Sequence, residues 1–465
     1  MRPADPGATS GRHALVVVTS LLPADDAAWA RALRPVLADR GGAWVGWDGG
    51  TGAPPGAFEG VALRPVGLSA AEVADHLEGQ CASTIVPLYH DAVERPTFHR
   101  RWRRAYRAVN ERYAAAATGL AAPGGTVWVH GHELQLVPAV LRAVRPDLTI
   151  GCYLPLPIPP AELFGRMPMR KEIVDGLLGS DVIGVPDRRS ADNLRRLAAR
   201  HGGPEHDGRV RVEALPMGAD AGRVERLAGS PDVARRLEDL RRELRGPRAV
   251  LLAVDRLDAT SGAEQRLAAF GELLADGRLR ADDCVLVQVV VPAARQSAGK
   301  ARIRMRVEQL VARINGAHSA VGRPAVHYLH QHLDPVDLVA LYRLADVFLA
   351  TPLRDGVNLT AKAFLAARLD DTGVLVLSEF SGIADELPEA VGVNPYDVED
   401  LKRAIAEAID PHRTAAGDRA AMARMRRTVR RHDVHWWTGS VVATLDGAAG
   451  NHTPARSVNN SQNIH

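Results

Sequence analysis

The stretch VFLATPLRDGVNLTAKAFLAARL, residues 347–369, contains the elements that decide the fold. An apolar run leads into a turn at Asp355 and Gly356, and an amphipathic segment with helical spacing follows. Gly356 permits a tight turn from strand to helix, and the amides at the start of such a helix can bind an anion. With Asp355 and Asn358 beside them, these amides could hold the hydroxyls and phosphate of a sugar ligand. The same residues equally fit an ordinary Asp-Gly turn with Asn358 as the helix cap, so both interpretations stand at this point.

Short, apolar, β-branched runs alternate with long amphipathic stretches along the rest of the chain. The runs occupy residues 14–18, 126–129, 148–154, 182–185, 249–254, 284–291, 347–351 and 373–378. Continuous apolar strands separated by helical segments are typical of parallel sheets that are covered on both faces. The pattern predicts an α/β chain of βαβ units with right-handed crossovers.

A charged stretch at residues 228–248 contains a Gly-Pro pair just before a new apolar strand, and it predicts a domain boundary. A length of 465 residues suits two doubly wound domains. We expect residues 13–230 to form the first domain and residues 246–431 the second, with polar, disordered tails at residues 1–12 and 450–465. The ligand site is expected in a cleft where the carboxyl ends of the strands of both sheets meet.

Composition excludes several classes of function. The 58 Lys and Arg residues against 55 Asp and Glu give a net charge of only +3, so nucleic acid is not an expected partner. No apolar run reaches the roughly 18–20 residues that cross a bilayer, and the N-terminal MRPADPGATSGRH lacks the apolar core of a signal peptide. Cys81, Cys152 and Cys284 lie in apolar segments and cannot form a disulfide framework. These features favour a protein of the cytoplasm.

His130, His132 and Glu133 offer one spacing that suits a metal ion, because His-X-His on a strand places both rings on one face. No third or fourth ligand is evident in the sequence, so no metal is expected. The arginine-rich stretches at residues 302–306 and 419–431 have the spacing of solvated helix faces.

Long phrases of the chain resemble trehalose-6-phosphate synthases, in order and at nearly the same spacing. They include VPLYHDAV (residues 86–93), VWVHGHELQLVPAVLR (127–142), AVDRLDATSG (253–262), ALYRLADVFLATPLRDGVNL (340–359) and DDTGVLVLSEFSGIADEL (370–387). The resemblance covers roughly residues 13–446. It implies a GT-B fold, with two Rossmann-like domains that face each other and a C-terminal helix near residues 432–446 that crosses back to the first domain. Trp436 and Trp437 are then expected to pack between the domains.

The family's reaction moves glucose from UDP-glucose onto glucose 6-phosphate with retention of configuration, and it uses neither a metal nor another cofactor. The resemblance assigns donor binding to Arg256, Asp355, Gly356, Asn358, Leu359 and Lys362. From its helix, Lys362 could instead point to a structural carboxylate. Ser261 stands where the family has the lysine that neutralises the diphosphate, and Ala363 where it has the glutamate that holds the ribose. A missing cation there removes a contact of order 1.5–3 kcal/mol.

On the acceptor side, the residues that hold the 6-phosphate in the family are two arginines, two tyrosines and a tryptophan. Their positions are occupied here by Leu21, His76, Leu77, Val86 and Ala294. Arg295, one position beyond Ala294, is the remaining candidate for acceptor binding.

At the reacting centre, Gly131 replaces the aspartate that positions the acceptor, and Pro155 replaces a sugar-binding histidine. Neither residue carries a polar side-chain atom. No catalytic residue is therefore assigned.

The strands, turns and caps match the family while the binding residues are selectively replaced. This contrast predicts a chain that folds as the family does without catalysing the family reaction. It would bind a nucleotide-sugar of the UDP-glucose type, if any ligand, and regulate or scaffold an active trehalose-6-phosphate synthase or phosphatase. The alternatives are an active glycosyltransferase with a changed donor or acceptor, and an ordinary trehalose-6-phosphate synthase.

Overall fold

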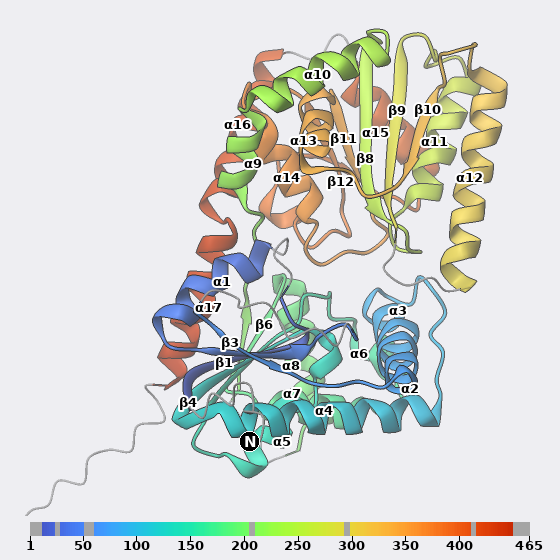
Figure 1. Cartoon of the computed structure of the whole chain (residues 1–465). Helices are drawn as coiled ribbons and strands as arrows, with labels where there is room; N and C mark the ends of the chain where they lie inside the picture. Colours follow the sequence, from blue (N-terminus) through green and yellow to red (C-terminus); the bar gives the residue numbers. More distant parts are fainter. Residues whose placement is uncertain are drawn as a thin grey trace, which may run out of the picture.

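Two α/β domains lie one above the other in the computed structural model of the chain (Figure 1). The structure describes residues 12–23, 28–50, 60–203, 210–292, 298–410 and 415–449. The first domain contains a seven-stranded sheet in the order β3-β2-β1-β4-β5-β6-β7, and the second a six-stranded sheet in the order β10-β9-β8-β11-β12-β13. Neighbouring strands pair in parallel throughout both sheets, which confirms the predicted pair of parallel α/β domains.

The elements of the first half of the chain are as follows. The strands are β1 (His13–Leu21), β2 (Ala43–Trp47), β3 (Ala62–Pro65), β4 (Ala121–His130), β5 (Thr149–Tyr153), β6 (Val182–Val185) and β7 (Arg211–Ala214). The helices are α1 (Ala28–Asp39), α2 (Ala70–Glu72), the π-helical η1 (Val73–Ile85), α3 (Val86–Tyr89), α4 (Arg100–Leu120), the 3₁₀ turn η2 (His132–Leu134), α5 (Val137–Val144), α6 (Ala161–Phe164), α7 (Arg170–Leu178) and α8 (Arg188–His201).

The second half of the chain contains the remaining elements. The strands are β8 (Ala249–Arg256), β9 (Cys284–Val291), β10 (Val326–His330), β11 (Val347–Ala350), β12 (Val374–Ser378) and β13 (Val391–Val393). The helices are α9 (Ala221–Ala228), α10 (Pro231–Glu243), α11 (Ala263–Ala275), α12 (Ala298–His318), α13 (Pro335–Leu344), α14 (Leu359–Ala367), the 3₁₀ turn η4 (Ala384–Glu386), α15 (Val398–Ala408), α16 (Ala415–Arg431) and α17 (Val434–Ala449).

Apolar residues on both faces of each strand explain why both sheets are covered by helices. In β1, Val16 and Val18 belong to the core on one face of the first sheet, while Leu15 and Val17 belong to the core on the other. Successive side chains of a strand point to opposite faces, so a continuous apolar run needs cover on both sides. Each fully buried Val or Leu contributes roughly 1.5–3 kcal/mol.

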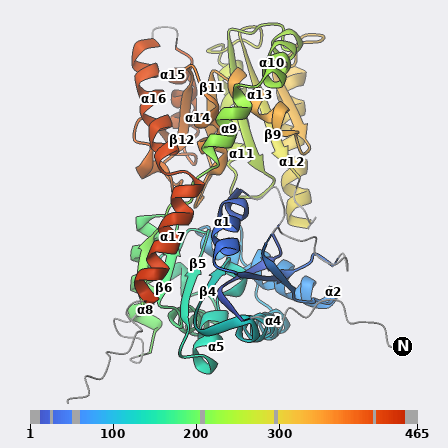
Figure 2. The same ribbon diagram turned by 60° about the vertical axis from the view of Figure 1, so that its left-hand side comes forward.

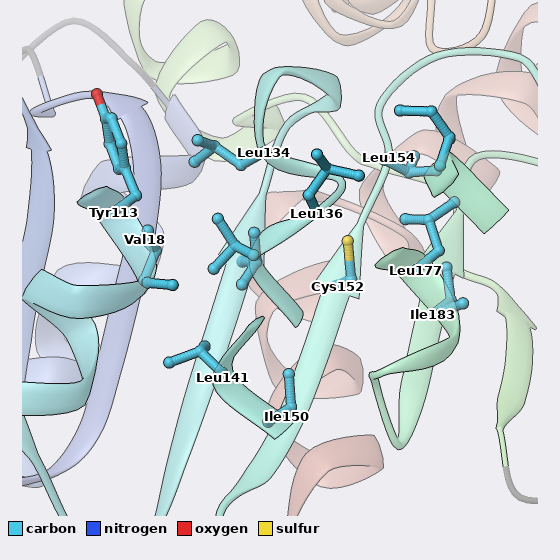
Figure 3. Close-up of a cluster of buried hydrophobic side chains, with 14 of the residues drawn as sticks. Val18, Tyr113, Leu134, Leu136, Leu141, Ile150, Cys152, Leu154, Leu177 and Ile183 are labelled. Atoms are coloured by element: carbon cyan, nitrogen blue, oxygen red, sulfur yellow. The ribbon is translucent and has the colours of Figure 1, made fainter. Parts of the chain in front are cut away.

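The larger core of the first domain lies between the sheet and helices α4, α5 and α7. Figure 3 shows part of it, where Leu141 of α5 and Leu177 of α7 lie beside Ile150, Cys152 and Ile183 of the strands. This packing holds β4 and β5 rigidly up to the points where they end, which is where the predicted site residues begin.

The chain crosses between the domains earlier than the sequence predicted. Helices α9 and α10, which carry much of the expected boundary at residues 228–248, pack against α13 and α14 of the second domain. Val233, Leu237 and Leu240 recur at helical spacing within the charged stretch and are buried. This apolar stripe packs α10 against the second domain. The chain therefore crosses between the domains after β7 and before α9, and residues 221–243 belong to the second domain.

Helix α17 returns the chain to the first domain. It follows α16, which packs on α14, and it lies against α1 and against the face of the first sheet at β5 and β6 (Figure 2). The two crossings lie side by side, since the Val434 amide donates a hydrogen bond of 3.0 Å to the Ala219 carbonyl. Trp437 is buried among first-domain residues, whereas Trp436 is 38% exposed.

Among the helices that the structure describes, none is both long and apolar enough to cross a membrane.

Candidate active site

A cleft of about 630 Å³ separates the two sheets at the carboxyl ends of their strands. Its first-domain wall consists of residues 19–23, Trp29, His90, residues 130–133 and residues 155–156. Its second-domain wall consists of residues 254–256, Asp258, residues 260–261, Pro352 and residues 354–360. Ligand sites in parallel α/β folds form at such strand ends, because the loops that follow the strands converge there.

The start of α14 lies in this cleft and is held by its own side chains. Asn358 caps the helix, and its Oδ1 accepts a hydrogen bond of 3.1 Å from the Ala361 amide. Asp355 Oδ1 accepts one of 3.1 Å from the Val357 amide. Asp355 therefore stabilises the turn and Asn358 caps the helix, and both residues also line the cleft.

Gly356 lies at a close approach of the two domains. A Cβ at this position would lie 3.2 Å from the Pro155 carbonyl oxygen and 3.2 Å from the Pro157 ring. A larger residue would therefore crowd the loop after β5, which would have to shift by a few tenths of an ångström.

Lys362 does not line the cleft, which corrects the expectation that it faces the donor side. Its residue is 1% exposed, and its Nζ donates to the Met217 carbonyl at 3.0 Å and contacts Glu386 Oε2 at 2.9 Å. A position three residues into α14 points the side chain back under the helix, away from the strand ends. Lys362 therefore ties α14 to the segment between the domains.

Arg256 is the open cation of the second-domain wall. Its side chain is 81% exposed, and its nearest carboxylate is that of Asp258, at 3.9 Å. Ser261 lies beside it, but its hydroxyl donates a hydrogen bond of 3.0 Å to the Asp258 carbonyl within the same turn. Ala363 packs against the apolar core under α14. Neither replaced donor position offers a charged group to a ligand.

A second arginine of this wall was not singled out from the sequence. Arg354 is 4% exposed and forms an ion pair of 3.1 Å with Asp91 of the first domain, while its Nη1 donates to the Phe380 carbonyl. Burial raises the pKa of Asp91, and the positive charge of Arg354 opposes that rise. The pair joins segments 263 residues apart, so no local sequence signal could have found it.

The positions that the resemblance assigns to acceptor binding do not lie together in the first domain. Leu21 lines the cleft and is 50% exposed. His76 is buried against Tyr106, with ring centroids 5.2 Å apart, and burial lowers its pKa to about 3. Leu77 packs against the first-domain core, and Val86 begins α3 outside the wall. Ala294 and Arg295 lie outside the described residues.

Gly131 directly follows β4 and Pro155 follows β5 by two residues, and both line the cleft. Gly131 has a φ of +118°, which strongly favours glycine. A carboxylate oxygen of Glu133 occupies the space that a Cβ at residue 131 would need. The missing side chain at this position is thus filled by the carboxylate two residues further along the chain.

His130 and His132 do not assemble a metal site with Glu133. The His130 ring stacks on Trp29, with centroids 4.3 Å apart and planes at 4°, and burial lowers its pKa to about 3. His132 Nδ1 lies 3.5 Å from Glu133 Oε2. Within the described ranges, no group of three or more His, Cys, Asp or Glu residues could hold a metal ion.

Solved structures share this architecture over nearly the whole chain. The α,α-trehalose-phosphate synthase of Burkholderia vietnamiensis superposes with a TM-score of 0.86 at 29% identity, covering 93% of this chain and 99% of that one. A Burkholderia xenovorans enzyme in complex with glucose-6-phosphate (TM-score 0.84, 26% identity) covers 93% and 100% of the two chains. The Escherichia coli enzyme bound with UDP-2-fluoro glucose (TM-score 0.85, 26%) covers 93% and 98%. These similarities confirm the GT-B fold.

Sequence comparison gives the same family. The trehalose-6-phosphate synthase of Mycobacterium avium (strain 104) is 43% identical over 475 residues, 94% of this chain and 96% of that protein. The enzyme of Mycobacterium tuberculosis (strain H37Rv) is 42% identical over 481 residues, 95% and 96% of the two chains. The sequence model of glycosyltransferase family 20 matches residues 22–447 of this chain. The chain therefore belongs to glycosyltransferase family 20, the family of the trehalose-6-phosphate synthases.

Proposed function

We propose that this chain binds a nucleotide-sugar in its cleft but does not transfer glucose to glucose 6-phosphate at a rate typical of its family. The observation that carries the proposal is the reacting centre, where Gly131 and Pro155 present no polar side-chain atom to the cleft. Removing a single transition-state hydrogen bond commonly costs 10²–10³ in rate. Losses at one site need not add, and we expect a rate at least about three orders of magnitude below that of an intact enzyme.

The donor half supports weak binding of the nucleotide-sugar. Related structures are described with UDP-2-fluoro glucose and with glucose-6-phosphate, so the cleft of this chain is the natural place for a ligand of that kind. Arg256 and the start of α14 remain available to a diphosphate, whereas Ser261 and Ala363 contribute neither a cation nor a carboxylate. We therefore expect affinity for a nucleotide-sugar to rest mainly on Arg256.

A regulatory or scaffolding role follows as the second part of the proposal. The chain has the fold of the family, while the positions that the resemblance assigns to binding carry other residues, and this contrast supports such a role. We propose an active trehalose-6-phosphate synthase or phosphatase as its partner, in the cytoplasm. The three cysteines are buried free thiols, as suits a reducing compartment.

The test is turnover and binding measured on the same purified protein. UDP release with UDP-glucose and glucose 6-phosphate should stay near background, while the Mycobacterium tuberculosis enzyme, assayed in parallel, turns over. Calorimetry should still detect UDP binding to this chain. Synthesis of trehalose 6-phosphate at a rate comparable with the control enzyme would overturn the proposal.

One observation favours a second candidate, a glycosyltransferase with a changed acceptor. The cleft remains about 630 Å³ in volume, and it contains the carboxylate of Glu133 in place of a side chain at residue 131. A group able to accept a proton is therefore still present at the strand end. Release of UDP from UDP-glucose that is stimulated by one of a panel of non-phosphorylated sugars, with glucose transferred to that sugar, would favour this candidate.

A further inference from the structure

The first-domain wall of the cleft carries no lysine or arginine among its described residues. Within the described part of this wall, the acidic side chain is that of Glu133, which is 20% exposed. A phosphate dianion placed against this wall would meet a carboxylate and no guanidinium or ammonium group. Like charges at such distances oppose binding, and they do so more strongly where water is partly excluded.

Glu133 turns into the cleft because of its neighbour. With no side chain at Gly131, the Glu133 carboxylate folds into the vacated volume, where a Cβ at residue 131 would collide with its Oε2. Its one described ionic contact is with His132 Nδ1, at 3.5 Å. The backbone carbonyl of Glu133 is held separately by Asn110 Nδ2 at 3.0 Å, so the main chain is fixed independently of the carboxylate.

The cationic groups in the rest of the cleft do not compensate the negative charge of Glu133. Arg354 is paired with Asp91, and the buried Asp255 is paired with Arg266. Arg256 lies 3.9 Å from Asp258, and it lines the same cleft as Asp355 and Glu133. Burial lowers the pKa of His90 and of His130, so neither buried ring adds positive charge at neutral pH.

The same wall has features that suit a polyhydroxylated ligand. Trp29 lines the cleft with an aromatic ring that stacks on that of His130. His130 is 8% exposed, and its Nδ1 has no hydrogen-bond partner among the described residues. Buried polar atoms are normally satisfied, so an unpartnered ring nitrogen in the wall of a cleft indicates a partner supplied by a ligand or a water molecule.

We propose that the first-domain wall binds an amine-bearing sugar or polyol, whose ammonium group pairs with Glu133, and that it disfavours sugar phosphates. The inference deepens the proposed function, on which it rests for taking the cleft as the ligand site. A charge-assisted hydrogen bond in a partly buried cleft corresponds to roughly tenfold or more in affinity.

The experiment measures binding in the absence of any nucleotide-sugar, so it is independent of turnover. Glucosamine, N-acetylglucosamine, glucose and glucose 6-phosphate are titrated into the full chain and followed by ligand-observed NMR. N-acetylglucosamine is the matched ligand, because it keeps the sugar ring and replaces the ammonium group by a neutral amide. We expect glucosamine to bind roughly tenfold more tightly than N-acetylglucosamine or glucose, and glucose 6-phosphate to bind least.

Two substitutions locate the effect. Glu133→Gln keeps the size of the side chain and should abolish the preference for glucosamine, and Glu133→Arg should invert it in favour of glucose 6-phosphate. Glu111→Gln is the matched control, since Glu111 lies on α4 at a separate surface hollow and should change nothing. Thermal unfolding of each variant verifies the fold.

Equal affinity for glucosamine and N-acetylglucosamine in the unmodified chain would overturn the inference, as would tighter binding of glucose 6-phosphate. A preference for glucosamine that survives Glu133→Gln would overturn the assignment to Glu133. Failure of the proposed function has a different signature, namely formation of trehalose 6-phosphate when UDP-glucose is added.

Discussion

Substitution of Lys362 separates a structural role from a ligand-binding role at a position where the family resemblance and the structure differ. Lys362 Nζ bonds to the Met217 carbonyl and to both carboxylate oxygens of Glu386, at 2.9–3.1 Å, and the residue is 1% exposed. Lys362→Met keeps the unbranched shape and removes the charge. It leaves a partly buried carboxylate without its cation and a backbone carbonyl without its donor.

The expected loss of stability follows from that geometry. Breaking a buried ion pair from one side costs about 3–5 kcal/mol. The Glu386 side chain is 17% exposed and keeps some access to water, so the lower end, about 3 kcal/mol, applies. For a domain of about 200 residues this lowers the unfolding temperature by roughly 6–12 °C. Lys362→Met combined with Glu386→Leu should recover part of the loss, since replacing both partners of a buried pair by apolar groups is often close to neutral.

Differential scanning calorimetry and UDP titration on the same variants provide the assay. Lys171→Met is the matched control, because the Lys171 side chain is 66% exposed and the substitution is chemically identical. Lys362→Met should lower the unfolding temperature and leave the affinity for UDP, measured well below that temperature, within twofold of the unmodified chain. An unchanged unfolding temperature together with a clear loss of UDP affinity would show that Lys362 is a donor ligand, and would refute the reasoning.

Three further predictions concern other parts of the molecule. Arg256→Ala should weaken UDP binding by roughly tenfold, because it removes the open cation of the cleft, and unchanged calorimetric affinity would disprove the donor assignment. Trp437→Ala should lower the free energy of unfolding, measured by urea denaturation, by about 3–5 kcal/mol, because Trp437 is 1% exposed and packs edge-on against Tyr153. Trp436→Ala, at a residue that is 38% exposed, should lower it far less, and equal losses would contradict the packing. Hydrogen bonding to Arg112 lowers the pKa of Glu72 from 4.5 to about 2, so the stability it provides is present above about pH 4.5 and is lost as the pH falls towards 2. Glu72→Gln should therefore lower the unfolding temperature at pH 6 and make little difference near pH 2, and a difference that does not shrink with falling pH would oppose this interpretation.

The strands that the sequence predicted are the inner strands of both sheets. All eight apolar runs form strands, namely β1, β4, β5 and β6 in the first domain and β8, β9, β11 and β12 in the second. The strands that were not predicted are β2 and the four edge strands β3, β7, β10 and β13. Edge strands are buried less completely, so their sequences carry polar residues, as in ALRP of β3 and RVEA of β7, and the apolar signal is weaker there.

The early domain crossing shows a second limit of the pattern. The charge of residues 228–248 indicated a linker, but Val233, Leu237 and Leu240 form a buried stripe within it. Charged residues on the outer face of an amphipathic helix look like a linker when only composition is considered. The spacing of the three apolar residues is that of a helix with one buried face, which indicates a packed helix and not a linker.

Only those features of the site that depend on residues close together in the sequence could be predicted. The turn at Gly356 and the cap at Asn358 are local features, and the structure has both. The direction of Lys362 depends on Met217 and Glu386, which come from other elements. The ion pair between Arg354 and Asp91 depends on the docking of two domains, which no spacing in the sequence encodes.

The distribution of intact and replaced groups bears on what the cleft is for. The two walls are in contact across the domains, with Gly356 close to Pro155 and Arg354 paired with Asp91. Packed interiors leave few voids, because an empty volume forfeits dispersion contacts and apolar burial. A cleft that had only to join two domains would gain stability by filling with side chains, yet about 630 Å³ remains open. Among the described residues, its first-domain wall carries the carboxylate of Glu133 and no lysine or arginine. This combination supports a cleft that still receives a ligand, of a charge opposite to that of the family's acceptor.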